Sequence, residues 1–139
     1  MDLKNVKIES LFDTLVENGY DFFTGVPDSA LKTFQNKIIE SDFENIIATH
    51  ESQAVAIAFG ANLAGKKSCV YLQNSGLGNV INPITSLCIP FENRPFLVIG
   101  HRHTLSQHKV MGDIDRDLID LTGYGEENYF IYHGENNVK

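Results

Sequence analysis

Apolar residues recur along the chain at helical spacing in some segments and as short strand-like runs in others. Residues 8–16 carry apolar side chains at helical spacing, and Gly19 stands where that helix can end. An aromatic-rich run at 20–24 then predicts a strand, and residues 29–39 predict a second helix with one apolar face. The chain therefore begins as helix, strand and helix.

The rest of the chain continues this alternation. Further strands are expected at 46–49, 68–73, 95–100 and 129–132, and further helices at 51–64, about 79–87 and about 114–121. The run at 95–100 is apolar almost throughout, as in a strand buried on both faces of a parallel sheet. Strands joined by helices of this length form right-handed βαβ units. We therefore expect an α/β fold with three layers (αβα), in which a mostly parallel open sheet has helices on both faces.

Three segments depart from the regular pattern. Pro83 is expected in the first turns of its helix, where its missing N–H costs little. Residues 101–110 are polar and predict an irregular loop, and residues 134–139 predict a polar tail. We expect one domain over residues 1–133, with the tail 134–139 outside it.

Composition narrows the classes of function. The 139 residues suffice for one domain with a core, and the net charge of 11 − 18 = −7 argues against a nucleic-acid partner. An anionic substrate stays open, because a site needs only a few local cations. No apolar run is long enough for a membrane span, and Met1–Lys4 does not start a signal peptide, so a cytoplasmic protein is expected. Cys69 and Cys88 are expected to be buried free thiols.

Glu51 is the first candidate for chemistry. It follows the strand at 46–49 and opens a helix of small residues that Gly65 can close. Open α/β folds bind ligands at the carboxyl ends of strands, and an interior carboxylate is costly without a purpose. A carboxylate in the first turn of a helix also stabilises that helix through its dipole, so the pair His50-Glu51 alone allows a purely structural interpretation.

Two glycine-containing turns also follow strands. Gly76 and Gly78 permit close approach of a ligand to the backbone, but their segment lacks the Lys-Ser/Thr ending of a P-loop and the third glycine of a dinucleotide fingerprint. A plain strand-to-helix turn is the alternative. The turn from Gly25 to Ser29 has the same placement, and there Asp28 or Ser29 can simply cap the next helix.

The segments His101-Arg102-His103 and Gln107-His108-Lys109 form the basic cluster of the chain. The two histidines at 101 and 103 suggest a metal, but no cysteine or paired carboxylate completes a zinc set at standard spacing. A solvated loop and an anion-binding or proton-transfer loop both stay open. His108 is the favoured residue for proton transfer, because histidine titrates near neutral pH.

Four segments together resemble the pyrimidine-binding domain of thiamine-diphosphate enzymes, and more closely the N-terminal part of phosphonopyruvate decarboxylases and the α chain of sulfopyruvate decarboxylases. The segments lie in the family's order and cover nearly the whole chain. They are His50-Glu51 with the helix after it, Phe23-Thr24-Gly25-Val26-Pro27-Asp28-Ser29, Gln73-Asn74-Ser75-Gly76-Leu77-Gly78-Asn79, and Ser106-Gln107-His108 with Met111-Gly112. The chain departs from the family at 100–106, where phosphonopyruvate decarboxylases carry a stretch rich in glycine and acidic residues.

The resemblance implies thiamine diphosphate as the cofactor and non-oxidative decarboxylation of a 2-oxo acid. The substrate would be phosphonopyruvate, giving phosphonoacetaldehyde and CO2, or sulfopyruvate. A glutamate at the position of Glu51 favours the imino tautomer of the aminopyrimidine through its N1′ atom. Glu51 and His108 are the implied catalytic residues. Gly25, Ser75, Gly76, Gly78 and Asn79 would line the cofactor together with Glu51, and Asp28, Ser29, Asn74 and His108 would face the substrate.

The resemblance also implies a missing half. The family holds the diphosphate through a divalent cation with a Gly-Asp-Gly…Asn segment, and the nearest match here, Met111-Gly112-Asp113-Ile114-Asp115, lacks the glycine after the aspartate. Mg2+ would then be held outside this chain, by a diphosphate-binding (β) subunit in a hetero-oligomer such as α2β2, or by a longer form of the chain. Two alternatives stay open: a non-catalytic α/β regulatory or interaction subunit, and a thiamine-dependent decarboxylase or carboligase for another 2-oxo acid.

Overall fold

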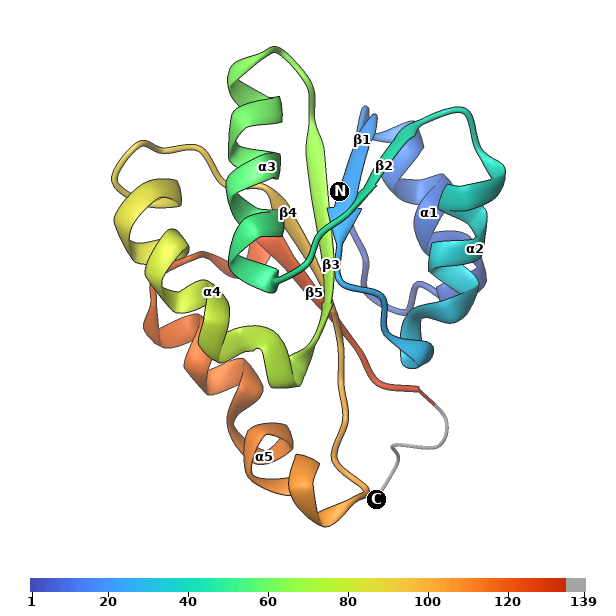
Figure 1. Ribbon diagram of the computed structural model, residues 1–139. Coiled ribbons are helices and arrows are strands. Elements are labelled where there is room, and N and C mark those ends of the chain that lie inside the picture. The colour runs from blue at the N-terminus through green and yellow to red at the C-terminus, as the bar shows by residue number, and fades with distance from the viewer. Residues whose placement is uncertain (135–139) are drawn as a thin grey trace.

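Five parallel strands form one open sheet in the order β2-β1-β3-β4-β5 (Figure 1). The structure is a computed structural model and describes residues 1–134. The strands are β1 (Phe22–Gly25), β2 (Glu44–Ile47), β3 (Ser68–Gln73), β4 (Phe96–Gly100) and β5 (Tyr129–Tyr132). All five expected strands are confirmed, with some ends shifted by one or two residues. Of the predicted tail at 134–139, residues 135–139 lie outside the described residues.

Helices connect the strands and cover both faces of the sheet. The α-helices are α1 (Ile8–Glu17), α2 (Lys32–Glu40), α3 (Glu51–Leu63), α4 (Leu77–Pro83) and α5 (Ser106–Leu121). Shorter helical turns are η1 (Ser29–Leu31), η2 (Asn74–Gly76), η3 (Ile84–Cys88) and η4 (Glu126–Asn128). In Figure 1, α1 and α2 lie on one side of the sheet, and α3, α4 and α5 lie on the other. The three-layer α/β fold is confirmed. Within residues 1–134, no helix is both long and apolar enough to cross a membrane.

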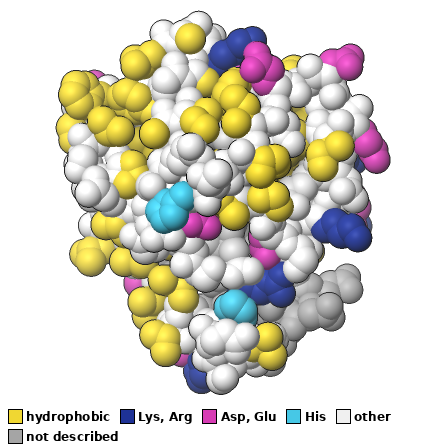
Figure 2. All heavy atoms as spheres, in the orientation of Figure 1, with side chains coloured by type: hydrophobic (Ala, Val, Ile, Leu, Met, Phe, Trp, Pro, Cys, Tyr) yellow, Lys and Arg dark blue, Asp and Glu magenta, His cyan; other side chains and the backbone are white. Residues whose placement is uncertain are grey.

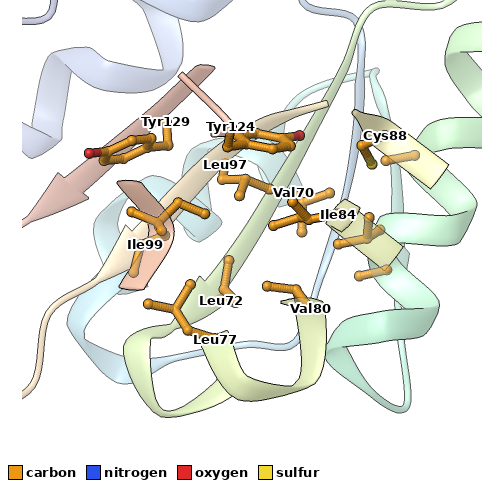
Figure 3. Packing of buried hydrophobic residues seen from close by; sticks show 14 of the residues in the cluster. Val70, Leu72, Leu77, Val80, Ile84, Cys88, Leu97, Ile99, Tyr124 and Tyr129 are labelled. Atoms are coloured by element: carbon orange, nitrogen blue, oxygen red, sulfur yellow. The ribbon is translucent and has the colours of Figure 1, made fainter. Parts of the chain in front are cut away.

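The central strands send side chains alternately into two apolar cores, one on each face of the sheet. In β3, Val70 and Leu72 belong to the core under α3 and α4, where Figure 3 shows them beside Leu97 and Val80. Tyr71 of the same strand belongs to the core under α1 and α2. Because both faces are buried, a central strand needs apolar residues at successive positions, which explains the uninterrupted runs in β3 and β4.

The small residues of α3 let this helix pack closely on the sheet and on α4. Ala54, Val55 and Ala58 are fully buried, and Gly65 just beyond the helix has φ +93°, a conformation that suits glycine. The opposite side is open: Leu63 is 72% exposed. Figure 2 shows hydrophobic side chains gathered over α3 and α4 on this face. The helix is therefore buried on one side only in this chain.

The expectation for Pro83 is wrong. Pro83 is the last residue of α4, and a π-helical turn, η3, continues from Ile84 to Cys88. Proline inside a helix removes one backbone hydrogen bond and crowds the preceding turn, and a local change to wider helical bonding accommodates it.

The expectation of an irregular loop at 101–110 is also wrong in its second half. Helix α5 begins at Ser106, and the backbone N–H of His108 donates to the carbonyl of Leu105 at 2.8 Å. The buried positions of α5 include Gly112 and Asp115 as well as Ile119. Because two of these three residues are not large and apolar, the sequence shows little of the helical period there.

Candidate active site

The candidate site lies where β1, β3 and β4 end, at the carboxyl edge of the sheet. These strands are adjacent, and the order β2-β1-β3 places the change in winding direction between β1 and β3. Open α/β sheets bind ligands outside such a switch point. The turns that leave the strand ends here are η1 with residues 26–28, η2, and residues 101–105.

Glu51 is the first residue of α3, directly after the N-cap residue His50, whose Nδ1 accepts the N–H of Ser52 at 3.2 Å. The Oε1 atom of Glu51 accepts a hydrogen bond from the Asn79 side-chain amide at 2.9 Å. Asn79 lies in the first turn of α4, so the two helix starts meet across the switch point. Glu51 is partly exposed, which corrects the expectation of an interior carboxylate, at least for this chain by itself.

Gly76 provides the space that the Glu51 side chain occupies. A Cβ atom at Gly76 would lie 2.5 Å from Cγ, 2.6 Å from Cδ and 2.8 Å from Oε2 of Glu51. Any other residue at position 76 would therefore displace the carboxylate. The two glycines that the sequence grouped with Gly76 differ: Gly78 has open space around it, and a Cβ at Gly25 would overlap the backbone of Tyr71 in the adjacent strand. Gly25 is thus required by the sheet itself.

The three consecutive residues of the turn η2 contact three different side chains. Asn74 donates to Asp115 on α5, Ser75 donates through its hydroxyl to Gln73 Oε1 at 2.6 Å, and Gly76 faces Glu51. The predicted site residues 74, 75, 76 and 79 therefore lie together with Glu51 at one edge. Asn74 is completely buried, whereas Ser75 and Asn79 are exposed.

Asp28 forms a second polar group at the ends of β1, β3 and β4. Its Oδ1 accepts hydrogen bonds from Gln73 Nε2 at 2.9 Å and from Arg102 Nη2 at 3.0 Å, and the same Nη2 donates to the hydroxyl of Ser29. The residue before α2 is Leu31, and neither Asp28 nor Ser29 makes a side-chain capping bond. Asp28 stands at the N-cap position of η1 without capping it through its side chain, and the side chains of both residues face Arg102 instead.

A buried pair that the sequence did not indicate lies behind η2. His101 Nδ1 and Asp115 Oδ2 are 2.6 Å apart, and Asn74 donates to the same Oδ2 at 3.0 Å and to the Arg102 carbonyl at 3.0 Å. The side chains of His101 and Asp115 are 3% and 6% exposed. The signal that could have found them is an aspartate three residues after Gly112 and four before Ile119, on the buried side of α5.

The second histidine of the basic cluster, His103, lies against a carboxylate on α5. His103 Nε2 lies 2.5 Å from Asp113 Oδ1, and Lys109 Nζ lies 2.9 Å from Asp113 Oδ2. The hydrogen bonds from Lys109 first, and then from His103, lower the pKa of Asp113 from 3.8 to about 2. The role of His108 in proton transfer stays a prediction. Nowhere within residues 1–134 do three or more metal-ligating side chains gather.

A surface depression of about 740 Å³ lies at the other end of the sheet. Its walls include residues 1–5, Phe96 at the start of β4 and Tyr129 at the start of β5. It shares no residue with the polar groups around Glu51 and Asp28. The carboxyl edge, where the ionisable groups and the strand ends coincide, therefore stays the candidate site.

Comparison with known proteins defines the class of this α/β domain. The chain belongs to the family described as "Thiamine pyrophosphate enzyme, N-terminal TPP binding domain". The model of this family matches residues 8–136. It is 42% identical over 100 residues to sulfopyruvate decarboxylase subunit alpha of Methanocaldococcus jannaschii, over 70% of this chain and 59% of that protein. It is 38% identical over 109 residues to phosphonopyruvate decarboxylase of Streptomyces viridochromogenes, over 74% of this chain and 28% of that protein.

The resemblance read from the motifs is confirmed, and the chain spans about three-fifths of the sulfopyruvate decarboxylase subunit that it matches. A solved structure, 2-oxoglutarate:ferredoxin oxidoreductase from Magnetococcus marinus, superposes with a TM-score of 0.56 at 19% identity. The match covers 73% of this chain and 18% of that one, and at this identity it concerns the fold alone.

Proposed function

We propose that this chain is the pyrimidine-binding part of a thiamine diphosphate-dependent decarboxylase for a 2-oxo acid with a second acidic group, such as phosphonopyruvate or sulfopyruvate. The relatives named above are decarboxylases of these two compounds. The observation that carries the proposal is the position of the Glu51 side chain. This carboxylate lies at the switch point, accepts a hydrogen bond from Asn79 and occupies the space that the absence of a side chain at Gly76 leaves open.

The residues at this edge fit the cofactor. Because Gly76 has no Cβ, the Glu51 carboxylate fits against it, and a larger residue at position 76 would displace that carboxylate. The space around Gly78, two residues further along the chain, is open. Ser75, Asn79 and Glu51 all keep exposed atoms. Thiamine diphosphate supplies the electron sink that the loss of CO2 from a 2-oxo acid requires.

Glu51 would hold a proton shared between its carboxylate and N1′ of the aminopyrimidine. Asn79 donates to Oε1 and so fixes the orientation of the carboxylate before the cofactor binds. The partial exposure of Glu51 matters here, because a covering domain would exclude water and strengthen the interaction. The domain that covers it would come from a partner β subunit, which would also hold the diphosphate and Mg2+.

The proposal is tested by cofactor binding and turnover of the chain mixed with its β subunit. We expect thiamine diphosphate with Mg2+ to bind tightly only to the mixture, as measured by calorimetry, and the mixture to release CO2 from phosphonopyruvate or sulfopyruvate. Glu51→Gln keeps the size of the side chain and should lower turnover by at least about a hundredfold, since it removes the ionised form. A mixture that binds no cofactor would leave a non-catalytic interaction subunit as the function. Turnover unchanged in Glu51→Gln would remove the role of Glu51.

A further inference from the structure

We propose that Arg102 recognises the second anionic group of the substrate, the phosphonate or sulfonate on C3. This inference rests on the proposed function and assigns the specificity of that site to one residue. Arg102 follows β4, and its side chain reaches across to the turn after β1. Its side chain is 27% exposed, although the Nε atom itself is buried.

The guanidinium of Arg102 is only partly used within the chain. A guanidinium carries five N–H donors. Both hydrogen bonds that Arg102 donates come from Nη2, one to Asp28 Oδ1 at 3.0 Å and one to the Ser29 hydroxyl. Its Nε is buried and has no partner within residues 1–134, and its Nη1 makes no hydrogen bond there either. The unused Nη1 of a fixed guanidinium suits an oxyanion as its ligand.

Asp28 orients Arg102. The Asp28 side chain is 2% exposed and also accepts a hydrogen bond from Gln73, so it cannot follow the arginine into solvent. Gly100 belongs to the same arrangement, because a Cβ there would overlap Oδ2 of Asp28. The guanidinium is thus held before a ligand arrives, which lowers the entropy cost of binding. A pair that existed only to neutralise Asp28 would be expected to use two guanidinium nitrogens, as bidentate pairs do.

A continuous line of contacts joins Arg102 to Glu51. Arg102 and Gln73 share the Oδ1 atom of Asp28, Ser75 donates to Gln73, and Gly76 next to Ser75 lies against Glu51. The cation and the carboxylate therefore lie at two ends of one line of contacts, of which all but the last, between Gly76 and Glu51, are hydrogen bonds or a peptide link. This arrangement suits a small substrate whose 2-oxo acid end reacts at the cofactor while its other end is an anion.

The test compares Arg102→Gln with Arg94→Gln in the complex with the β subunit. Arg94 is a matched control, because its Nε is also buried without a partner in residues 1–134 but it precedes β4, at the opposite edge of the sheet. We expect Arg102→Gln to lower kcat/KM for phosphonopyruvate or sulfopyruvate by about 10- to 100-fold, mainly through KM, and to leave that for pyruvate within about twofold. Arg102→Lys should recover part of the loss, and Arg94→Gln should show no change of preference. An equal loss of kcat/KM for the doubly acidic substrates and for pyruvate would show that Arg102 has only a structural role. A lower melting temperature without a change of substrate preference would show the same.

A second measurement separates this inference from the proposed function. If the unaltered complex decarboxylates none of these acids, the proposed function fails. The binding of methylphosphonate then tests the anion site at Arg102 independently of any activity. We expect methylphosphonate to shift the Nε–H resonance of Arg102 in the NMR spectrum of the chain, and the binding to disappear in Arg102→Gln. Methylphosphonate that shifts neither this resonance nor its neighbours would overturn the assignment, whatever the activity.

Discussion

The side chain of Glu51 occupies the space that any side chain at Gly76 would need. The two residues are 25 positions apart, on different helical turns, and a Cβ at Gly76 would come within 2.8 Å of three Glu51 atoms. The glycine sets the position of the carboxylate, and Asn79 sets its orientation through one hydrogen bond of 2.9 Å.

Replacing Gly76 by alanine should move the Glu51 carboxylate while leaving the stability of the chain nearly unchanged. Gly76 has φ −83°, which alanine adopts without strain, so the cost falls on the flexible Glu51 side chain. We expect the free energy of unfolding to change by less than about 1 kcal/mol. Cofactor affinity, measured by calorimetry of the complex, should fall at least about tenfold. The matched control is Gly60→Ala on α3, where a Cβ meets nothing within 4 Å, and its affinity should be unchanged.

Removing Asp115 should destabilise the chain strongly. Asp115 accepts hydrogen bonds from Asn74 and from the backbone of Arg116, and it pairs with His101. Breaking a buried pair by removing one partner costs about 3–5 kcal/mol. We expect Asp115→Ala to lose about 3 kcal/mol in urea unfolding, and the exposed Asp117→Ala on the same helix to stay within about 0.5 kcal/mol. Equal effects of the two substitutions would contradict a structural role for the buried pair.

The contacts of Asp113 with Lys109 and His103 predict a measurable shift in the titration of the Asp113 carboxyl group. The pKa of Asp113 is lowered from 3.8 to about 2, with the Lys109 hydrogen bond as the largest cause. A lowered pKa in the folded state adds stability above the unfolded value, and this stability is lost as the pH falls from 3.8 to about 2. NMR of the Asp113 carboxyl carbon should give a midpoint near the lower value, and Lys109→Met should raise it. Lys32→Met, on α2, is the control and should leave the midpoint unchanged.

The two cysteines should be unreactive in the folded chain. Cys69 and Cys88 are both free and buried. Burial raises the pKa of Cys88 to about 11 and that of Cys69 further, so neither forms appreciable thiolate at about pH 8. A disulfide reagent should therefore titrate no thiol in the native chain and both thiols after denaturation. Rapid labelling of Cys88 in the native chain would show that the π-helical turn opens.

The positions of Glu51 and of the strands could be predicted because their signals are local. Burial of β3 and β4 on both faces leaves uninterrupted apolar runs, and the parallel βαβ order then places Glu51 at a carboxyl edge. The grouping of residues 74–79 with Glu51 was implied by the family resemblance. Their separate roles could not be predicted, because the sequence treats Gly25, Gly76 and Gly78 alike, although of these three only Gly76 touches the carboxylate.

Tertiary structure alone decided which distant side chains meet. Arg102 pairs with Asp28 across 74 positions, and His101 pairs with Asp115 on a helix whose first turns gave no periodic signal. Hydrophobic periodicity reports how deeply a residue is buried, but the partner of a buried charge depends on strand order and on the packing of a crossover helix. The sequence by itself therefore determined the layers, the strands and the edge at which the candidate site lies. The packed fold determined how Asp28, Arg102 and Glu51 are held there, because hydrogen bonds act only over contact distance.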